Sequence, residues 1–168
     1  MILKGGYLYY DTPVGILCLD TKFPKPVGHM RNPLTYNFPV VQSVIKGVGV
    51  KEILSPTPEL IKPFIEVARQ LERDGVKCIT GSCGFMALFQ KEIAAAVKIP
   101  VLLSSLIQIP LVRALHGPGC KIGVLTASAS SLTPKHFERV GAEIKDVFIK
   151  GMEGYSEFRE TIIEGKRN

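Results

Sequence analysis

The residues with the clearest chemical potential surround Cys83. Residues 76–85 combine a short apolar segment, typical of a strand, with a tight Gly-Ser-Cys-Gly turn at 81–84 and the start of a predicted helix. A thiol at a helix N-terminus lies beside unpaired backbone N–H groups and the positive end of the helix dipole, which favour the thiolate. The same N–H groups suit a substrate carboxylate or a developing oxyanion. Cys83 is therefore the predicted catalytic residue, although a small residue in a tight turn can also be purely structural.

The other three cysteines do not extend this site. Cys18 and Cys78 lie in apolar segments expected to be strands, where cysteine behaves as a small hydrophobic residue. Cys120 precedes a predicted strand instead of following one. Because the chain has no C-x-x-C pair and its three histidines are scattered, we expect no metal site. This cysteine usage favours a reduced, cytoplasmic protein.

Two further polar turns follow predicted strands. Asp20 and Thr21 come directly after an apolar run, and a polar loop begins at Thr126. In open parallel sheets, ligands bind beyond the carboxyl ends of the strands, so we expect these turns to converge with Cys83. The alternative roles are local: Asp20 would cap a turn, and Thr126 and Ser128 would cap the entry to a helix.

Strand-like and helix-like segments alternate along the chain. Strands are expected at residues 14–19, 40–46, 76–80, 100–103, 121–125 and 147–149. Helices are expected at residues 58–74, 85–97, 105–115, 134–140 and 156–164. Short connections between them predict βαβ units with right-handed crossovers, and thus an α/β fold in which helices flank a parallel sheet.

One connection is unusually long. Residues 22–39 are rich in proline and carry no helical or strand pattern. A loop of this length in a compact domain is usually functional, so we expect Tyr36 and Phe38 to cover the site as part of a lid. His29 in the same loop is expected to be solvated.

The charge and apolar runs exclude two classes of partner. The formal net charge is +6, but lysines and arginines are dispersed and form no basic run before Lys166 and Arg167, so we expect no nucleic-acid binding. The longest apolar run, at residues 101–112, is too short and too polar to cross a membrane. The N-terminus lacks the apolar core of a signal peptide.

Three segments in this order resemble the aspartate/glutamate/hydantoin racemase family: residues 15–21, 79–85 and 123–128. Residues 20–39 and 83–110 look especially like an uncharacterised subgroup of that family. The resemblance implies two flavodoxin-like α/β halves with the active site between them and no pyridoxal phosphate or metal. It also implies one cysteine from each half, because inversion at carbon needs an acid and a base on opposite faces. Cys83 matches the cysteine of the first half.

The expected substrate-binding residues lie in the three strand-end turns. They are Asp20, Thr21, Ser82, Gly84, Phe85, Thr126, Ala127 and Ser128. The glycine and phenylalanine after Cys83 depart from the asparagine and threonine common in amino-acid racemases.

The resemblance divides the chain into a first half, residues 1–115, and a second half, residues 116–168, which is expected to be incomplete and to lack a second cysteine turn. We therefore expect a racemase- or isomerase-like protein that acts on a small carboxylate through Cys83 and forms a homo-oligomer. One alternative is a cysteine hydrolase or amidase, weakened because Phe85 replaces the last glycine of a hydrolase elbow. The other is a non-catalytic domain that binds a small anion or dimerises through a sheet edge.

Overall fold

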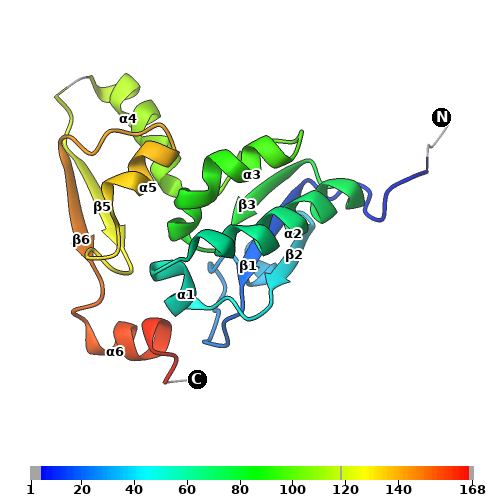
Figure 1. Ribbon diagram of the computed structural model, residues 1–168, viewed down its shortest axis with the longest axis horizontal. Helices are drawn as coiled ribbons and strands as arrows, with labels where there is room; N and C mark the ends of the chain where they lie inside the picture. Colours follow the sequence, from blue (N-terminus) through cyan, green and yellow to red (C-terminus); the bar gives the residue numbers. More distant parts are fainter. Residues whose placement is uncertain (1–4, 118, 167–168) are drawn as a thin grey trace.

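The first strand, β1 (Val14–Leu19), lies inside a parallel sheet with the strand order β2-β1-β3-β4. The computed structural model describes residues 5–117 and 119–166 (Figure 1). A continuous apolar sequence suits a parallel strand that is covered on both faces, and Ile16, Leu17 and Cys18 of β1 are completely buried. The other strands of the sheet are β2 (Val40–Ile45), β3 (Cys78–Gly81) and β4 (Val101–Leu102).

Helices α2 (Ile61–Asp74) and α3 (Gln90–Ala96) cross the same face of this sheet (Figure 1). Helix α2 buries Phe64, Ala68 and Leu71 at helical spacing and ends at Gly75, whose φ of 106° is left-handed. Pro63 lies in the first turn of α2, where a missing N–H disrupts no helical hydrogen bond. The short helix α1 (Val50–Leu54) precedes α2 and was not predicted.

A second sheet pairs β5 (Ile122–Thr126) with β6 (Val147–Gly151), also in parallel. The connection between them contains α5 (Pro134–Arg139), which packs against residues 84–89 of the first unit. Helix α4 (Ile109–His116) links the two sheets. After β6 the chain forms α6 (Ser156–Phe158), which continues as one π-helical segment, Arg159–Ile163, below β5 and β6 in Figure 1.

The predicted fold class is confirmed: the protein is α/β, with parallel strands flanked by helices. Each predicted strand is present, and the strands form two sheets, one of four strands and one of two. The helix predicted directly after Cys83 begins instead as a 3-10 helix, Gly84–Phe89, before α3. The division at residues 115 and 116 stays a prediction.

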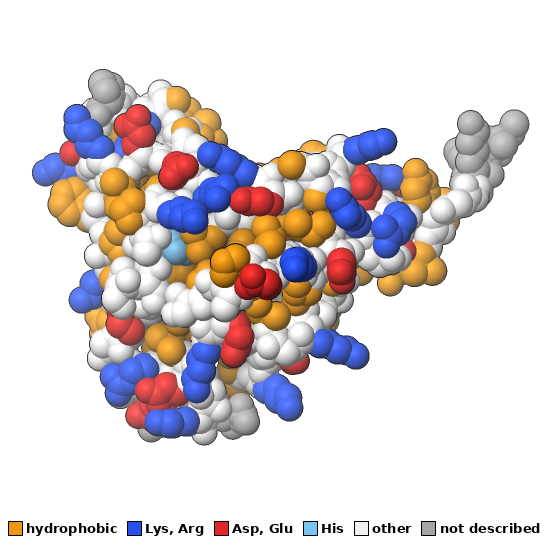
Figure 2. All heavy atoms as spheres, viewed as in Figure 1, with side chains coloured by type: hydrophobic (Ala, Val, Ile, Leu, Met, Phe, Trp, Pro, Cys, Tyr) orange, Lys and Arg blue, Asp and Glu red, His pale blue; other side chains and the backbone are white. Residues whose placement is uncertain are grey.

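Charged side chains of both signs are interspersed over the face that Figure 2 shows, with apolar side chains between them. No helix within residues 5–117 and 119–166 combines the length and apolar character needed to cross a membrane. A cytoplasmic location and self-association stay predictions.

Candidate functional site

A cleft of about 510 Å³ opens where β1, β3 and β5 end. The structure brings the three strand-end turns to this cleft, as expected for the carboxyl edge of parallel strands. Their lining residues are Leu19, Thr21, Ser82, Cys83, Gly84, Phe85, Leu125, Thr126 and Ala127. Two of the expected substrate-binding residues, Asp20 and Ser128, do not line it.

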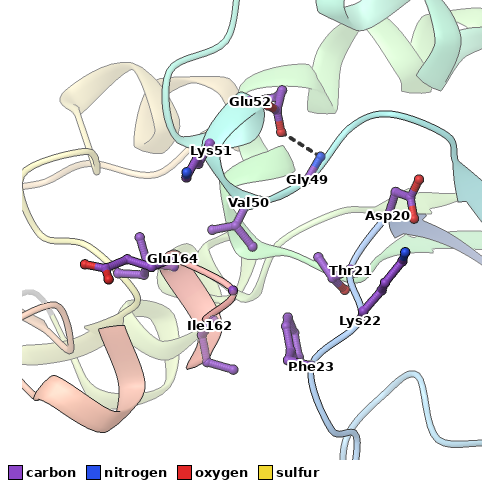
Figure 3. A pocket seen from close by; sticks show the side chains of 12 residues that line it. Asp20, Thr21, Lys22, Phe23, Gly49, Val50, Lys51, Glu52, Ile162 and Glu164 are labelled. Atoms are coloured by element: carbon purple, nitrogen blue, oxygen red, sulfur yellow. Dashed lines mark hydrogen bonds between the residues drawn. The ribbon is translucent and has the colours of Figure 1, made fainter. Parts of the chain in front are cut away.

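Asp20 turns away from Cys83 and takes the capping role. Its exposed carboxylate accepts a hydrogen bond from Gly47 N at 3.1 Å, just after β2. Asp20 lines a shallow neighbouring pocket, where it lies near Lys22 and across the pocket from Ile162 (Figure 3). On the α1 side of this pocket, Glu52 accepts a hydrogen bond from Gly49 N at 2.8 Å.

Ser128 likewise supports its own loop. Its side chain is 5 % exposed, and its hydroxyl oxygen accepts from Ser131 N at 3.2 Å. It also lies 3.1 Å from the hydroxyl oxygens of Ser130 and Ser131. The Ser128 hydroxyl is therefore hydrogen-bonded within its own turn, and Ser128 does not line the cleft.

The turn that carries Cys83 is fixed by close packing and by two hydrogen bonds. Ser82 N donates to Leu17 O at 2.8 Å, and the Ser82 hydroxyl accepts from Leu19 N at 3.1 Å, so the ends of β1 and β3 are tied together. At Gly81, a Cβ atom would lie 2.6 Å from Met86 Sδ and 3.1 Å from Leu103 O. Ser82 is thus a positioning residue, although it also lines the cleft.

Cys83 is partly buried and caps the 3-10 helix with an extended backbone. Burial raises the pKa of its thiol to about 11, and the Phe85 N–H beside the sulfur offsets this only in part. The predicted stabilisation of the thiolate is therefore wrong for the free protein. The helix that follows the thiol is a short 3-10 helix, and desolvation outweighs the attraction of its N–H groups. At neutral pH the thiol form of Cys83 therefore predominates.

The loop at residues 22–39 covers the cleft with its first part. Phe23, Pro24, Pro26, His29 and Arg31 line the cavity. The two residues expected to form the lid do not line it: Tyr36 donates to Met30 O at 2.7 Å, and its ring lies 5.4 Å from that of Phe38.

His29 and Arg31 are the site residues that sequence reasoning missed. Burial lowers the pKa of His29, and the positive charges of Lys25 and Arg31 lower it further, so the imidazole is neutral near pH 7. Its Nδ1 accepts from Arg31 N at 3.0 Å, which places the proton on Nε2. His29 is partly exposed and lines the cleft. The available signal was the position of a single arginine and a histidine within a long loop that follows the first strand.

Cys83 is the only thiol among the residues that line this cleft. Cys18 is completely buried in β1, and Cys78 lies at the opposite end of β3, where its thiol donates to Pro13 O at 3.5 Å. Within the described part of the chain, no group of three or more His, Cys, Asp or Glu side chains is arranged to hold a metal ion.

The chain is similar in sequence to several dimethylsulfoniopropionate lyases. It is 31 % identical over 126 residues to the enzyme of Durusdinium sp. clade D, an alignment that covers 73 % of this chain and 42 % of the relative. It is 32 % identical over 130 residues to dimethylsulfoniopropionate lyase 3 of Emiliania huxleyi (strain CCMP1516), covering 76 % and 34 %. The chain therefore spans less than half the length of these relatives. No protein-family model matches it.

Two solved structures share the fold. An aspartate racemase homologue from Pyrococcus horikoshii OT3 superposes with a TM-score of 0.50 and 19 % identity, over 91 % of this chain and 70 % of that one. A mutant of arylmalonate decarboxylase in a sulfate-associated form gives a TM-score of 0.50 and 16 % identity, over 83 % and 62 %. At these identities the likeness concerns the backbone architecture, and this chain has the racemase-like α/β fold.

Proposed function

We propose that this protein removes a proton from the carbon next to the carboxylate of a small substrate, with Cys83 as the base. The observation that carries the proposal is the position of Cys83, the one thiol lining the cleft at the carboxyl ends of β1, β3 and β5. The names of the sequence relatives and structural neighbours support it, because dimethylsulfoniopropionate, aspartate and arylmalonate are all carboxylates.

Elimination from dimethylsulfoniopropionate is the reaction that fits these residues best. The Cys83 thiolate takes a proton from the carbon next to the carboxylate, and the C–H electrons form the new carbon–carbon double bond. The bond from the neighbouring carbon to sulfur breaks, and dimethyl sulfide leaves with its electron pair, so acrylate is the second product. The thiol then returns its proton to solvent. This sequence needs one base, whereas racemisation by two bases needs a second group on the opposite face.

A cationic substrate would also offset the high pKa of the Cys83 thiol. In the free cleft, burial disfavours the negative sulfur. A dimethylsulfonio group that binds nearby would bring a positive charge into the same low-dielectric surroundings and lower the pKa of Cys83. The substrate itself would thus promote ionisation of the base that attacks it.

Strand-end groups would stabilise the negative charge that develops on the substrate. Cys83 and Gly84 of the turn, and Thr126 at the end of β5, line this cavity and would supply backbone N–H and hydroxyl donors. Such groups are effective where charge develops in a site that excludes water. Their role is secondary to the base, because they act on a charge that proton removal creates.

Racemisation or exchange at an amino acid is the second candidate, favoured by the fold shared with the aspartate racemase homologue. The hydrolase alternative lacks an activating base in the cleft, because His29 Nδ1 accepts the hydrogen bond from Arg31 N and Nε2 carries the proton.

The test measures both reactions in the purified protein. Dimethyl sulfide is measured by gas chromatography and acrylate by liquid chromatography after addition of dimethylsulfoniopropionate, and aspartate is monitored by NMR for exchange of its α-hydrogen in D₂O. We expect equal amounts of the two elimination products, lost in Cys83→Ser and kept in the control Cys120→Ser. Exchange of aspartate without elimination would favour the second candidate. Unchanged activity in Cys83→Ser, or neither reaction, would contradict the proposal.

A further inference from the structure

Arg31 reaches the cleft from the long loop and is held there in a defined position. Its Nη1 donates to Leu19 O at 2.7 Å and to Thr21 Oγ1 at 3.0 Å, so the guanidinium is fixed at the carboxyl end of β1. Its backbone is fixed as well, because Gln42 Nε2 donates to Arg31 O at 3.1 Å. The side chain therefore lines the cavity in a preorganised conformation.

The guanidinium of Arg31 is only partly satisfied by protein groups: the Cys18 thiol lies beside it, and Nη1 is hydrogen-bonded. The Nε atom is buried, yet it has no hydrogen-bond partner within residues 5–117 and 119–166. No carboxylate of the same residues forms an ion pair with Arg31 either. An incompletely paired charged donor is unfavourable, so a ligand oxygen that meets the guanidinium from the cleft would be bound strongly.

The surroundings favour an anion at this position. Arg31 is the only Asp, Glu, Lys or Arg side chain among the described residues that line the cleft. Lys25 lies close by, where its ammonium group donates to the carbonyl oxygens of Thr21 at 3.0 Å and Phe23 at 2.7 Å. The positive charge around Arg31 is therefore not compensated by an acidic side chain of the cleft.

We propose that Arg31 is the carboxylate-binding residue of this cleft, with its guanidinium facing the substrate carboxylate. A planar guanidinium matches the two oxygens of a carboxylate better than a point charge does. This inference rests on the proposed function and deepens it. Arg31 would select small monocarboxylates and orient the adjacent carbon toward Cys83, while the apolar residues of the cleft would contact the rest of the substrate.

The test measures binding without turnover, in the Cys83→Ser protein. Propionate carries the carboxylate and propionamide has nearly the same shape without the charge, so titration calorimetry with both isolates the contribution of the carboxylate. We expect propionate to bind at least tenfold more tightly than propionamide. Adding Arg31→Gln should abolish this preference, whereas adding Arg73→Gln, at an exposed position of α2, should preserve it.

Arg31→Lys provides a second variant if Arg31→Gln fails to fold, because it keeps a positive charge and a donor for Leu19 O. Propionate binding should weaken about tenfold in this variant, since the planar edge is lost. Equal propionate affinity in a folded Arg31 variant and its parent would overturn the inference. If Cys83 is essential for elimination but an Arg31 variant leaves KM unchanged, the inference fails and the proposed function stands. If propionate binding depends on Arg31 without any turnover, the carboxylate site stands and the reaction does not.

Discussion

The two sheets of this protein contribute differently to the cleft. The four-stranded sheet has a central strand that is buried on both faces, with Ile16, Leu17 and Cys18 at 0 % exposure. The β5–β6 sheet packs one face against the core and leaves Leu125 and Phe148 70 % and 60 % exposed on the other. The four-stranded sheet and the loop at residues 22–39 carry the Cys83 thiol, the Arg31 guanidinium and the hydrogen bonds between the ends of β1 and β3. The second sheet supplies uncharged lining.

Chemistry and shape therefore come from different parts of the fold. Groups that must be held within fractions of an ångström are attached to the doubly covered sheet, where packing fixes their positions. Groups that only border the substrate are attached to the sheet with one free face.

The largest effect is expected from removing the sulfur of the first sheet. Cys83→Ala should reduce kcat/KM for the elimination substrate at least about a thousandfold, because no other side chain of the cleft replaces the base. Thr126→Val, at the end of β5, should change it less than about tenfold. Steady-state kinetics of the two variants checks the contrast. Equal losses would show that both sheets carry the reaction.

The second prediction uses the raised pKa of Cys83. The base acts as a thiolate, and its pKa of about 11 means that the thiolate fraction rises tenfold for each pH unit below that value. The kcat/KM value should therefore increase steadily from pH 6 to pH 10. Because kcat reports the complex, its profile should level off at a lower pH when the bound substrate is cationic. A kcat/KM that is constant between pH 7 and pH 9 would contradict both the pKa and the proposed base.

The third prediction compares the stability of the two regions. Phe64 of α2 is completely buried, with its ring 5.1 Å from that of Phe89, and Phe64→Ala should reduce the free energy of unfolding by about 3–5 kcal/mol. Phe148→Ala on the free face of β6 should change it by about 0.5 kcal/mol or less. Urea unfolding measures both. A large loss for Phe148→Ala would mean that this face is covered in solution.

The smallest effects distinguish two serines in equivalent places. Ser82→Ala leaves Leu19 N without its side-chain acceptor, and Ser128→Ala does the same to Ser131 N. Each change should cost about 1 kcal/mol of unfolding free energy. Only Ser82→Ala should also lower kcat, by about tenfold at most, because it loosens the turn that carries Cys83. An equal decrease in kcat for Ser128→Ala would remove the distinction between the sheets.

Local patterns predicted the elements well, because strands and helices follow from apolar spacing. The unbroken apolar run of β1 and the helical stripe of α2, ended by Gly75, indicated both elements and their approximate bounds. Helix α1 was missed because its five residues are too few to show a helical period. Topology also predicted that strand ends would meet.

The properties of the site depended on contacts that spacing cannot show. Asp20 follows β1 as expected, but its carboxylate bonds to Gly47, a neighbour only after β2 folds beside β1. Arg31 reaches the cleft through bonds to Leu19 and Thr21 that depend on the path of an irregular loop. The pKa of Cys83 depends on which atoms displace water from the sulfur, so a correctly placed thiol received the wrong ionisation.

The missing side chain at Gly81 has a consequence for redesign of the substrate range. Even a methyl group there would press on Met86 and on the carbonyl of Leu103, and would shift the turn that follows. Attempts to accept bulkier acids should therefore leave residue 81 untouched and trim the opposing hydrocarbon wall instead, for example at Leu54 or Phe158. Residues such as Leu54 and Phe158 should therefore determine which larger substrates fit. The turn at residues 81–84 should remain unchanged in every variant that retains activity.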